Sequence, residues 1–469
     1  MAMAMARIIA FLLFLFILSS SSLSFSPADD YLLNCGSHVY STIDNRRFVS
    51  DASKSNFFFT SEGSVALQGE HLSPNVPQIY RTARVFAQQA KYEFNVHEKG
   101  TYMLRLHFYP INSSKIDLNQ GAQFHVTVNG HVVLTNFSGD DLSSRVVREF
   151  LIWVDVGKVV IRFVPSKDSK FAFVNAIEVI SAPKDLIADV ATSVSRDGTG
   201  KLNGLAKQAM EVMYRINVGG RKVTPFNDTL WRTWIPDDDF FKAADASSSD
   251  KAYFTGRIKY RPGGASREVG PDNVYNTARV ARRSNGLSWD FPVSTGYKYM
   301  IRMHFCDIAS RSLGLLYFNV YINGNLAYED FDISYSAGYV LASPYYIDFV
   351  VDPPSGSSII TVSVGPSNKT SVDEHGVDAM LNGLEIMKMN NSMGSLDGFV
   401  STDMLLRSCP NRRNLSIFIA LMAFMCIFMS FYIVAQRKKV SDGFGWTKLS
   451  MDVHEVIPKS GNQFAAIKP

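Results

Sequence analysis

Alternating apolar and polar residues recur along the central part of the chain and predict β-strands. Met103–Phe108, Phe124–Val128 and Phe318–Ile322 each place apolar side chains at every second position. This spacing buries one face of a sheet and exposes the other. The pairs Asn129-Gly130 and Asn323-Gly324 follow two of these strands, and Asn-Gly suits the positive φ angles of a type I′ hairpin turn. We therefore expect an all-β region built from antiparallel sandwiches.

Four sequence blocks occur twice in the same order, which predicts two homologous domains. The pairs are Tyr80–Arg84 with Tyr275–Arg279, GTYMLRLHFYPI from Gly100 with GYKYMIRMHFCDI from Gly296, FHVTVNGHVVL from Phe124 with FNVYINGNLAY from Phe318, and FVNAIEVI from Phe173 with MLNGLEIM from Met380. We expect the domains to span residues 29–182 and 211–392. Residues 183–210 are expected to be a linker, with a loop at Asp197–Gly200 and a short helix at Leu205–Met213.

Two longer apolar runs at the ends of the chain predict targeting and anchoring segments. Arg7 precedes the apolar run Ile8–Leu18, which is too short to span a bilayer and is typical of a signal peptide. We expect residues 1–28 to be removed after Ala28; an uncleaved anchor is the alternative. The second run, residues 415–435, has no charged residue and is long enough to cross the hydrocarbon core. A buried core helix is the alternative there.

Basic residues set the expected orientation of this membrane helix. Arg437, Lys438 and Lys439 directly follow the apolar run, as is typical of the cytoplasmic side. We therefore expect a type I single-pass protein. Its ectodomain would end in a flexible juxtamembrane stalk at residues 393–414, and residues 436–469 would form a short cytosolic tail.

Composition narrows the possible partners. The net charge is only +4 and 12% of the residues are aromatic, which gives no reason to expect nucleic acid as a partner. Three cysteines, Cys35, Cys306 and Cys409, fall in the expected ectodomain, so at most one intrachain disulfide forms there, with its pairing open. N-x-[ST] sequons agree with an extracellular location; those we expect to be glycosylated are Asn112, Asn136, Asn227, Asn368 and Asn390.

The ordered set of blocks resembles the ectodomain of the plant malectin-like receptor kinases of the FERONIA and THESEUS type. The resemblance rests on YLLNCGS (31–37), IYRTARVF (79–86), LRLHFYPIN (104–112), FVNAIEVI (173–180), MYRINVGG (213–220), FNDTLWRTW (226–234), RMHFCDI (302–308), VSVGPS (362–367) and LNGLEIMKM (381–389). It implies two tandem malectin-like β-sandwich domains related to jelly rolls, in a plasma-membrane protein whose ectodomain lies in the apoplast. It also implies pectin-type polysaccharide and rapid-alkalinization-factor-type peptides as ligands. The implied protein partners are a GPI-anchored LORELEI-like co-receptor and other receptor kinases.

The chain departs from this family after the membrane segment. Members carry an intracellular Ser/Thr kinase, whereas the sequence contains no Gly-rich loop, V-A-I-K lysine, H-R-D catalytic loop or D-F-G motif. We therefore do not expect kinase activity from these residues. Two explanations stay open: a natural receptor-like protein without a kinase, and a gene model that ends early.

The residues give little support for an enzyme, a cofactor or a metal site. The acidic run Asp237–Asp239 is expected to be a solvated loop, with a Ca²⁺ site as the alternative. His107 and His304 occupy equivalent strand positions and are expected to be structural. A wall-modifying glycosidase needs two facing carboxylates, and no such pair is apparent.

Binding is a better hypothesis than catalysis. Tyr80 and Arg84, and their counterparts Tyr275 and Arg279, match part of the sugar-binding motif of animal malectin, although its aromatic pair is missing. They are candidate ligand residues, with a core role for both tyrosines as the alternative. Further candidates are the two tryptophans expected to be exposed, Trp231 and Trp234, and an inter-domain cleft.

Two basic clusters could attract acidic uronate polymers, with a solvated mixed-charge face as the alternative. They are Arg257/Lys259/Arg261 and Arg279/Arg282/Arg283. The leading interpretation is a cell-surface receptor-like protein that recognises wall carbohydrate or a secreted peptide and acts as co-receptor or decoy. The alternative is the ectodomain of a truncated receptor Ser/Thr kinase.

Overall fold

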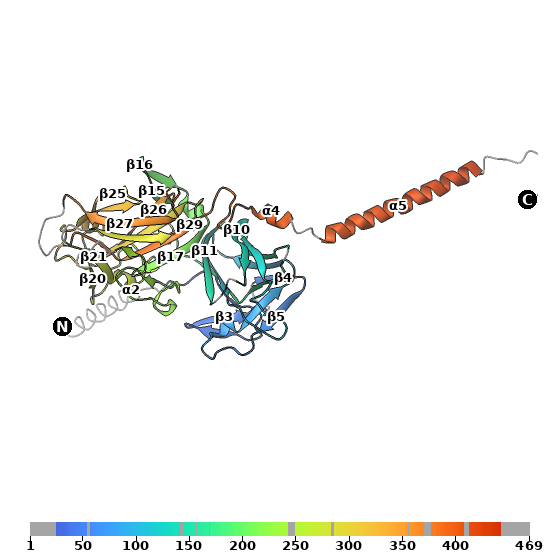
Figure 1. The fold of residues 1–469 in the computed structure, drawn as a ribbon, viewed down its shortest axis with the longest axis horizontal. Coiled ribbons are helices and arrows are strands. Elements are labelled where there is room, and N and C mark those ends of the chain that lie inside the picture. The colour runs from blue at the N-terminus through green and yellow to red at the C-terminus, as the bar shows by residue number, and fades with distance from the viewer. Residues whose placement is uncertain are drawn as a thin grey trace, which may run out of the picture. The chain divides into compact units, whose positions relative to one another are not determined.

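The β-rich prediction is confirmed by a computed structural model. It describes residues 25–53, 57–140, 142, 144–155, 157–167, 169–242, 249–282, 286–354, 356–369, 377–407 and 412–441. The chain forms two compact units, residues 1–406 and 407–469. In the first unit the strands build two β-sandwich lobes, blue to cyan and green to orange in Figure 1. Most of the predicted signal peptide, up to residue 24, lies outside the described residues.

The first lobe packs a six-stranded layer against a five-stranded sheet, with a three-stranded sheet at one end. The six strands are β1 (Asp30–Asn34), β2 (Ser41–Ile43), β3 (Arg46–Ser50), β8 (Gly100–Phe108), β11 (Val146–Val154) and β14 (Ala176–Ser181). The five-stranded sheet has the order β10 (His131–Ser138), β9 (Gln123–Val128), β12 (Gly157–Pro165), β7 (Ala90–Val96), β4 (Phe57–Ser61). The three-stranded sheet contains β13 (Ala172–Val174), β6 (Thr82–Phe86) and β5 (Ser64–Gln68).

The second lobe repeats this arrangement, which confirms the internal repeat. Its first layer contains β15 (Val190–Ser195), β16 (Gly198–Asn203), β17 (Met210–Asn217), β18 (Ile235–Pro236), β23 (Tyr299–Cys306), β26 (Pro344–Val351) and β29 (Gly383–Met389). The facing sheet is β19 (Phe241–Lys242), β22 (Leu287–Pro292), β27 (Ile359–Pro366), β24 (Tyr317–Ile322), β25 (Asn325–Asp332). The end sheet contains β20 (Ser249–Tyr253), β21 (Thr277–Ala281) and β28 (Ala379–Leu381).

The helical elements that the structure describes between residues 25 and 407 are short and lie in connections outside the strands. They are η1 (Gln78–Tyr80), η2 (Leu205–Lys207), η3 (Pro225–Asn227), α2 (Asp272–Tyr275), α3 (Ile333–Ser336) and α4 (Thr402–Arg407). The predicted Asn-Gly hairpins are also present. Asn129 and Gly130 have φ of 46° and 88°, and Asn323 and Gly324 have 52° and 77°. Both pairs therefore adopt the left-handed backbone that a type I′ turn requires.

Each lobe has an apolar core between its two layers. In the first lobe, Leu106 and Phe108 of β8 meet Phe124 and Phe163 of the facing sheet. The core of the second lobe is built in the same way. Alternating inward side chains account for both cores, as the sequence pattern predicts.

The prediction that residues 183–210 are only a linker is wrong, because this segment supplies the strands β15 and β16 and the first residue of β17 to the main sheet. β15 and β16 form a hairpin, and β15 pairs in parallel with β26. The predicted helix at Leu205–Met213 is reduced to the single turn η2, and β17 begins at Met210. β17 pairs with β29 of its own lobe, and its first residues also pair with β11 of the first lobe, through Met210 with Leu151 and Glu211 with Phe150. This pairing on both sides overrides the helix propensity of the segment.

One continuous sheet of 13 strands therefore runs through both lobes. A third apolar cluster fills the junction beside it. Its buried residues come from the first lobe, from residues 183–209, here called the hairpin segment, and from the second lobe: Leu32, Phe48, Ile79, Tyr80, Met103, Leu151, Ala176, Ile180, Leu186, Ile187, Ala191, Leu205, Met210, Leu230, Met300, Val350, Met387 and Met389. The two lobes are therefore joined by hydrogen-bonded backbone and by a shared core.

The predicted flexible stalk is wrong for its first part. Residues 391–402, here called the strap, return from the second lobe and lie along β10 of the first. The N–H of Leu396 donates to the carbonyl of Val132 at 2.8 Å, and the N–H of Val132 donates to Gly394 at 3.2 Å. The N–H of Thr135 donates to the carboxylate of Asp397 at 2.6 Å, and Leu396 is fully buried. The strap is thus a third connection between the lobes.

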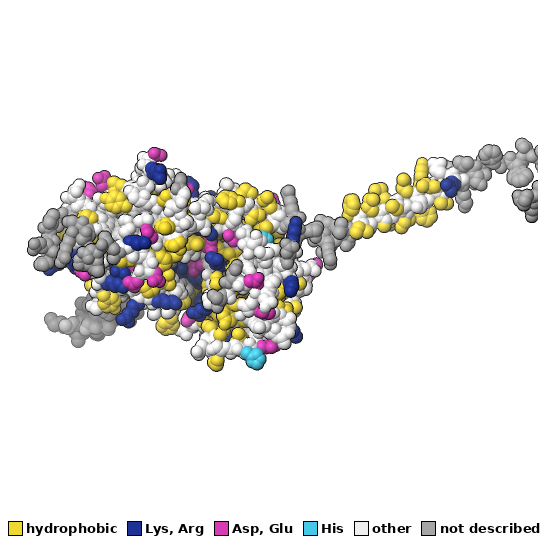
Figure 2. Space-filling view, viewed as in Figure 1, with side chains coloured by type: hydrophobic (Ala, Val, Ile, Leu, Met, Phe, Trp, Pro, Cys, Tyr) yellow, Lys and Arg dark blue, Asp and Glu magenta, His cyan; other side chains and the backbone are white. Residues whose placement is uncertain are grey.

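The second unit contains α5 (Arg412–Ser441). Among the described residues it is the one helix long and apolar enough to cross a membrane, over Phe418–Arg437, with a mean hydropathy of 2.5. Figure 2 shows that its surface is almost wholly hydrophobic, whereas charged side chains of both signs are scattered over the β-rich unit. The helix contains the predicted span 415–435, and residues 442–469 of the predicted tail lie outside the described residues.

Candidate functional site

Tyr80, the first candidate ligand residue, is buried in the junction between the lobes. Its hydroxyl lies 2.8 Å from Nδ1 of His107, and Nε2 of His107 lies 2.9 Å from a carboxylate oxygen of Glu178. Burial raises the pKa of Tyr80, so the phenol stays protonated. The ring belongs to the shared core together with Leu230, and Trp231 packs against the same core. The side chain therefore has a structural position, the alternative that the sequence left open.

Tyr275 has the same arrangement in the second lobe. Its hydroxyl lies 2.9 Å from Nδ1 of His304, whose Nε2 lies 3.3 Å from Glu385. Tyr275 and His304 are fully buried, and burial raises the pKa of the tyrosine and lowers that of the histidine. A cluster that includes Ile258 covers Tyr275. The expectation of open aromatic faces for sugar stacking at these two tyrosines is therefore not met in this structure.

The two motif arginines also have structural partners. Nε and Nη2 of Arg84 donate to the two carboxylate oxygens of Asp51 at 2.9 and 2.7 Å, and Asp51 also accepts from the N–H of Gly36 at 3.0 Å. In the second lobe Arg279 pairs with Asp237, which accepts from the N–H of Gly219 at 3.0 Å. The repeated Tyr and Arg positions thus maintain the same internal contacts in both lobes.

The prediction that Asp237–Asp239 is a solvated loop is wrong for its first residue. Asp237 is fully buried and accepts hydrogen bonds from the indole N–H of Trp289 at 2.9 Å as well as from Arg279. Asp238 and Asp239 are exposed. In the described part of the chain no group of three or more His, Cys, Asp or Glu side chains could hold a metal ion.

The prediction that both tryptophans are exposed anchors is also wrong. Trp234 is fully buried, and its indole N–H donates to Asp228 at 2.9 Å. Trp231 is half-buried at the junction, where its ring lies 5.3 Å from the guanidinium of Arg46 of the first lobe. A cation over an indole face is attracted by the ring quadrupole, so Trp231 helps to join the lobes.

An array of buried ion pairs occupies the junction where the sequence suggested a cleft. Glu149 of β11 accepts from Arg105 of β8 at 2.7 Å and from Arg215 of β17 at 2.8 Å. Arg215 also pairs with Glu385 at 2.6 Å, and Arg105 pairs with Glu178 at 2.9 Å. Arg105 further donates to the carbonyl of Leu230 in the second lobe at 2.8 Å. The array therefore crosses the boundary between the lobes.

Electrostatics keep this array ionised. Burial by itself would raise the pKa of Glu149, but the two adjacent guanidinium groups outweigh burial and lower it to about 2. The pKa values of Arg105 and Arg215 are raised, because their carboxylate partners outweigh the cost of burial. A buried charge that loses its partner is strongly destabilising, so these groups act together.

Surfaces that remain open lie elsewhere on the second lobe. Arg257, Lys259 and Arg261 are exposed, which agrees with the first basic cluster. The second cluster is not a free basic patch: Arg279 is buried and paired, Arg282 pairs with Asp250 at 2.8 Å, and Arg283 lies outside the described residues.

Two hydrogen bonds to backbone carbonyls, one from a side chain and one from a backbone N–H, bring an exposed tyrosine beside the basic residues. Arg261 donates to the carbonyl of Gly338, and the N–H of Lys259 donates to that of Ala342 at 2.8 Å. Tyr339, in the same loop, is 61% exposed. We call this set the basic–aromatic surface: Arg257, Lys259, Arg261 and Tyr339.

Carboxylates and tyrosines line a neighbouring hollow of about 500 Å³ on the second lobe, whose Tyr335 contacts Tyr339 edge to face with ring centroids 6.0 Å apart. Its lining residues are Tyr317, Tyr328, Glu329, Asp330, Asp332, Tyr335, Ser336 and Lys369. Tyr335 is 67% exposed, and Lys369 pairs with Asp330 at 2.9 Å. This carboxylate–tyrosine hollow already holds one ammonium group of the chain, so its chemistry suits a cationic side chain.

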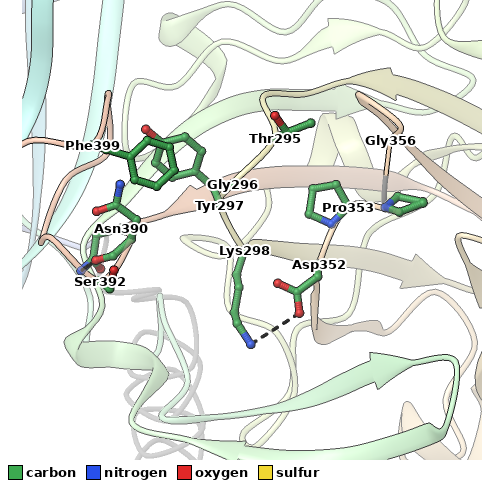
Figure 3. Close-up of a pocket in the computed structure, with 12 residues that line it drawn as sticks. Thr295, Gly296, Tyr297, Lys298, Asp352, Pro353, Gly356, Asn390, Ser392 and Phe399 are labelled. Atoms are coloured by element: carbon green, nitrogen blue, oxygen red, sulfur yellow. Dashed lines mark hydrogen bonds and ion pairs between the residues drawn. The ribbon is translucent and has the colours of Figure 1, made fainter.

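A groove of about 460 Å³ lies where the strap leaves the second lobe (Figure 3). Figure 3 shows Phe399, Asn390 and Ser392 on one side and Asp352, Pro353 and Gly356 on the other, with Lys298 between them. Lys298 lies 3.5 Å from Asp352. The other lining residues are Thr295, Gly296, Tyr297, Pro354 and Asn391. We call it the strap groove; no sequence pattern pointed to it, because it is assembled from three distant segments.

The described cysteines do not form the single disulfide that the sequence allowed. Cys35 and Cys306 are buried free thiols, one in each lobe, and Cys409 lies outside the described residues. Burial raises the pKa of both thiols, so neither is reactive as a thiolate.

Comparison with known proteins agrees with this fold. A model of the malectin-like domain family matches residues 33–389. The chain belongs to the malectin-like family. Curated relatives are receptor-like protein kinases of Arabidopsis thaliana. A probable receptor-like kinase is 43% identical, and the match covers 82% of this chain and 47% of that relative. HERK 1 is 36% identical, with 92% of this chain and 51% of HERK 1 covered, and FERONIA is 31% identical, with 83% of this chain and 46% of FERONIA covered. The chain spans about half the length of the curated relatives it matches.

Solved structures give the same result for the malectin-like chain. The ectodomain of ANX2, a plant receptor-like kinase, has a TM-score of 0.70 and 29% identity, covering 79% of this chain and 98% of that one. FER, in a crystal structure with the peptide RALF23 and LLG2, has a TM-score of 0.67 and 31% identity. The match covers 80% of this chain and 98% of the FER chain. The predicted ectodomain type, of the FERONIA and THESEUS kind, is therefore confirmed.

Replacing Glu149 by Gln should weaken the joint between the lobes. We expect the free energy of unfolding at pH 7 to fall by about 3–5 kcal/mol, because Arg105 and Arg215 would stay buried without their shared carboxylate. The folded-state pKa of Glu149 lies below its unfolded value, so its contribution is complete above about pH 4.5 and is lost as the pH falls toward 2. Denaturant unfolding of both proteins between pH 7 and pH 2 measures the effect.

Glu93→Gln is the matched control. Glu93 also has a pKa lowered to about 2, through hydrogen bonds with Lys158 and Lys91, but it lies near the surface. Solvent screening limits such pairs to about 1 kcal/mol or less. Equal effects of the two substitutions would contradict the role assigned to the buried array.

Proposed function

We propose that this chain is the extracellular recognition part and membrane anchor of a plant cell-surface receptor-like protein. The observation that carries the proposal is the likeness of its malectin-like unit to FER in complex with RALF23 and LLG2. By this proposal the unit binds a secreted peptide of the same type, with a LORELEI-type protein as partner. The buried Tyr–His–Glu chains support binding over catalysis, because their polar atoms already bond to one another.

The proposed location is the plasma membrane, with the β-rich unit in the apoplast. Helix α5 supplies one apolar span, which ends at Arg437 and is followed by Lys438 and Lys439 in the sequence. Four sequon asparagines, Asn112, Asn136, Asn227 and Asn368, are exposed on the β-rich unit, which agrees with glycan attachment in the secretory pathway. Both features support a type I orientation.

The carboxylate–tyrosine hollow is the proposed contact for a basic side chain of the peptide. Aromatic faces and carboxylates together attract ammonium and guanidinium groups, and exposed tyrosines are frequent anchors of interfaces. The prediction is that Tyr328→Ala with Tyr335→Ala weakens binding of RALF23, used as a probe with LLG2 present, by about tenfold or more. Interferometry on the full chain in nanodiscs measures this change.

Tyr253→Ala with Phe226→Ala is a suitable control, because both side chains are exposed on the same lobe and neither lines the hollow. If the variant with Tyr328→Ala and Tyr335→Ala bound the probe as tightly as the parent chain and the control do, the hollow would be ruled out as the contact. Failure of the parent chain to bind any peptide of this type, with or without LLG2, would contradict the peptide proposal itself.

Binding of a pectin-type polymer is a second candidate function, favoured by the basic–aromatic surface. Its three cations could pair with uronate carboxylates, while Tyr339 offers an exposed ring for stacking on a sugar face. We expect the charge reversals Arg257→Glu, Lys259→Glu and Arg261→Glu together to abolish retention on polygalacturonate at low salt, with the parent chain eluting as salt rises.

Reversing Arg196, Lys201 and Lys207 instead, on the hairpin segment, gives a variant of the same net charge. If this control loses retention equally, the binding is a general charge effect and the basic–aromatic surface is not a site. Retention that persists in the Arg257→Glu, Lys259→Glu, Arg261→Glu variant would also show that the basic–aromatic surface is not the binding site.

The way in which recognition would be passed on depends on the part of the protein beyond the membrane helix. We propose a co-receptor or decoy that acts without a kinase of its own; the alternative is a receptor Ser/Thr kinase of wall sensing whose catalytic part is encoded further on. Sequencing mature transcripts through the codon of Pro469 decides between them. A stop codon there supports the first, and continuation into a kinase reading frame supports the second.

A further inference from the structure

The strap groove contains a glycosylation sequon in its lining. Asn390-Asn391-Ser392 fits the N-x-[ST] pattern, and all three residues line the groove. Among the expected sites that the structure describes, Asn390 is the one that is half-buried; Asn112, Asn136, Asn227 and Asn368 are exposed. A glycan at the exposed sites would extend into solvent, whereas one at Asn390 would start inside a cavity.

Hydrogen bonds fix the orientation of the Asn390 amide. Its Oδ1 accepts from the N–H of Ala209 at 3.0 Å, and its own backbone N–H donates to the carbonyl of Ala209 at 3.0 Å. Its Nδ2 has only a contact of 3.5 Å with the carbonyl of Asn391, at the limit of a hydrogen bond. The carbonyl side of the amide is therefore held by the protein, and the nitrogen that would carry a sugar remains available.

The groove offers the chemistry that a sugar needs. Phe399 is 69% exposed, although it stacks on Tyr297 with ring centroids 6.2 Å apart and an angle of 24° between the rings. Such a ring can stack on the apolar face of a pyranose. Lys298 and Asp352, both exposed, add a donor and an acceptor for hydroxyl and acetamido groups.

We propose that an N-glycan on Asn390 occupies the strap groove as an intramolecular ligand, with its first sugar against Phe399, and fastens the strap to the second lobe. The proposal rests on the extracellular location proposed above. In the modification, a lipid-linked oligosaccharide pyrophosphate is the donor. The bond between C1 of the sugar and the pyrophosphate oxygen breaks, a bond between C1 and Nδ2 forms, and Nδ2 gives up one proton as the lipid pyrophosphate leaves.

This position gives the glycan a mechanical role. The strap joins the second lobe at Asn390, pairs with β10 of the first lobe through Leu396 and Asp397, and leads into α4. A glycan held in the groove would restrain the strap at the end where Phe399 is otherwise exposed. Local opening of the strap would then cost more free energy with the glycan than without it.

The test uses the full chain expressed in plant secretory cells. Glycopeptide mass spectrometry measures occupancy of each sequon, and hydrogen–deuterium exchange measures protection of residues 391–402. We expect Asn390 to be occupied, and Ser392→Ala to remove its glycan and speed exchange in the strap by about tenfold. Ser392→Ala is the decisive variant because it leaves the Asn390 side chain and its bonds to Ala209 in place. Phe399→Ala should speed exchange similarly while occupancy stays unchanged.

Asn227→Gln is the control, since it removes a sequon on an exposed segment and should leave the strap unchanged. Two results would overturn the proposal: an unmodified Asn390 in a chain glycosylated at other sequons, or a Ser392→Ala strap as protected as that of the parent. A chain with no glycan at any sequon would also contradict the proposed extracellular location, so the two failures are distinguishable.

Discussion

The architecture of this malectin-like unit depends on one strand that belongs to both lobes. β17 pairs with β29 of its own lobe along its length, and at Met210 and Glu211 it also pairs with β11 of the first lobe. Backbone N–H and C=O groups at a sheet edge must find partners when they are buried, and here each lobe supplies the partner of the other. The shared apolar core and the buried ion pairs then form around a joint whose geometry the backbone has already set.

The ion pairs show how an internal repeat was adapted to this joint. Arg105 and Glu178 of the first lobe correspond to Arg302 and Glu385 of the second, and both arginines pair with an acidic residue of the adjacent strand. The repeats differ at one register position: Leu32 lies opposite Glu178, whereas Arg215 lies opposite Glu385. Arg215 can therefore bridge to Glu149 of the other lobe. This apolar-to-cationic difference between the repeats supplies one of the ion pairs that cross the junction; the pair of Arg148 with Glu211 at 3.1 Å is another.

This joint has a consequence for recognition. The motif positions that resemble a sugar site are used for internal contacts, with Tyr80 covered at the junction and Tyr275 covered by a segment of its own lobe. Aromatic and charged side chains remain exposed in the carboxylate–tyrosine hollow on β24, β25 and α3, in the loops of the basic–aromatic surface, and beside the strap. Loops on a rigid scaffold are common positions for binding residues, because they vary without disturbing the core. A ligand bound beside the strap would also lie next to the segment that leads toward the membrane helix.

The sequence by itself determined the features that depend on local pattern. Period-two alternation and Asn-Gly pairs specified strands such as β8 and β9 and the hairpin that follows β9, repeated blocks specified two lobes, and an uninterrupted apolar run specified α5. Tertiary structure alone decided which of those residues face solvent. Trp234 and Asp237 look like exposed loop residues in sequence, yet they are buried, because Asp228 in the same segment satisfies the indole N–H of Trp234 and Arg279 of a distant strand pairs with Asp237. The Leu205–Met213 segment likewise lost its predicted helix because two neighbouring strands supply partners for its backbone. Burial and pairing are properties of contacts between distant segments, and no local pattern encodes them.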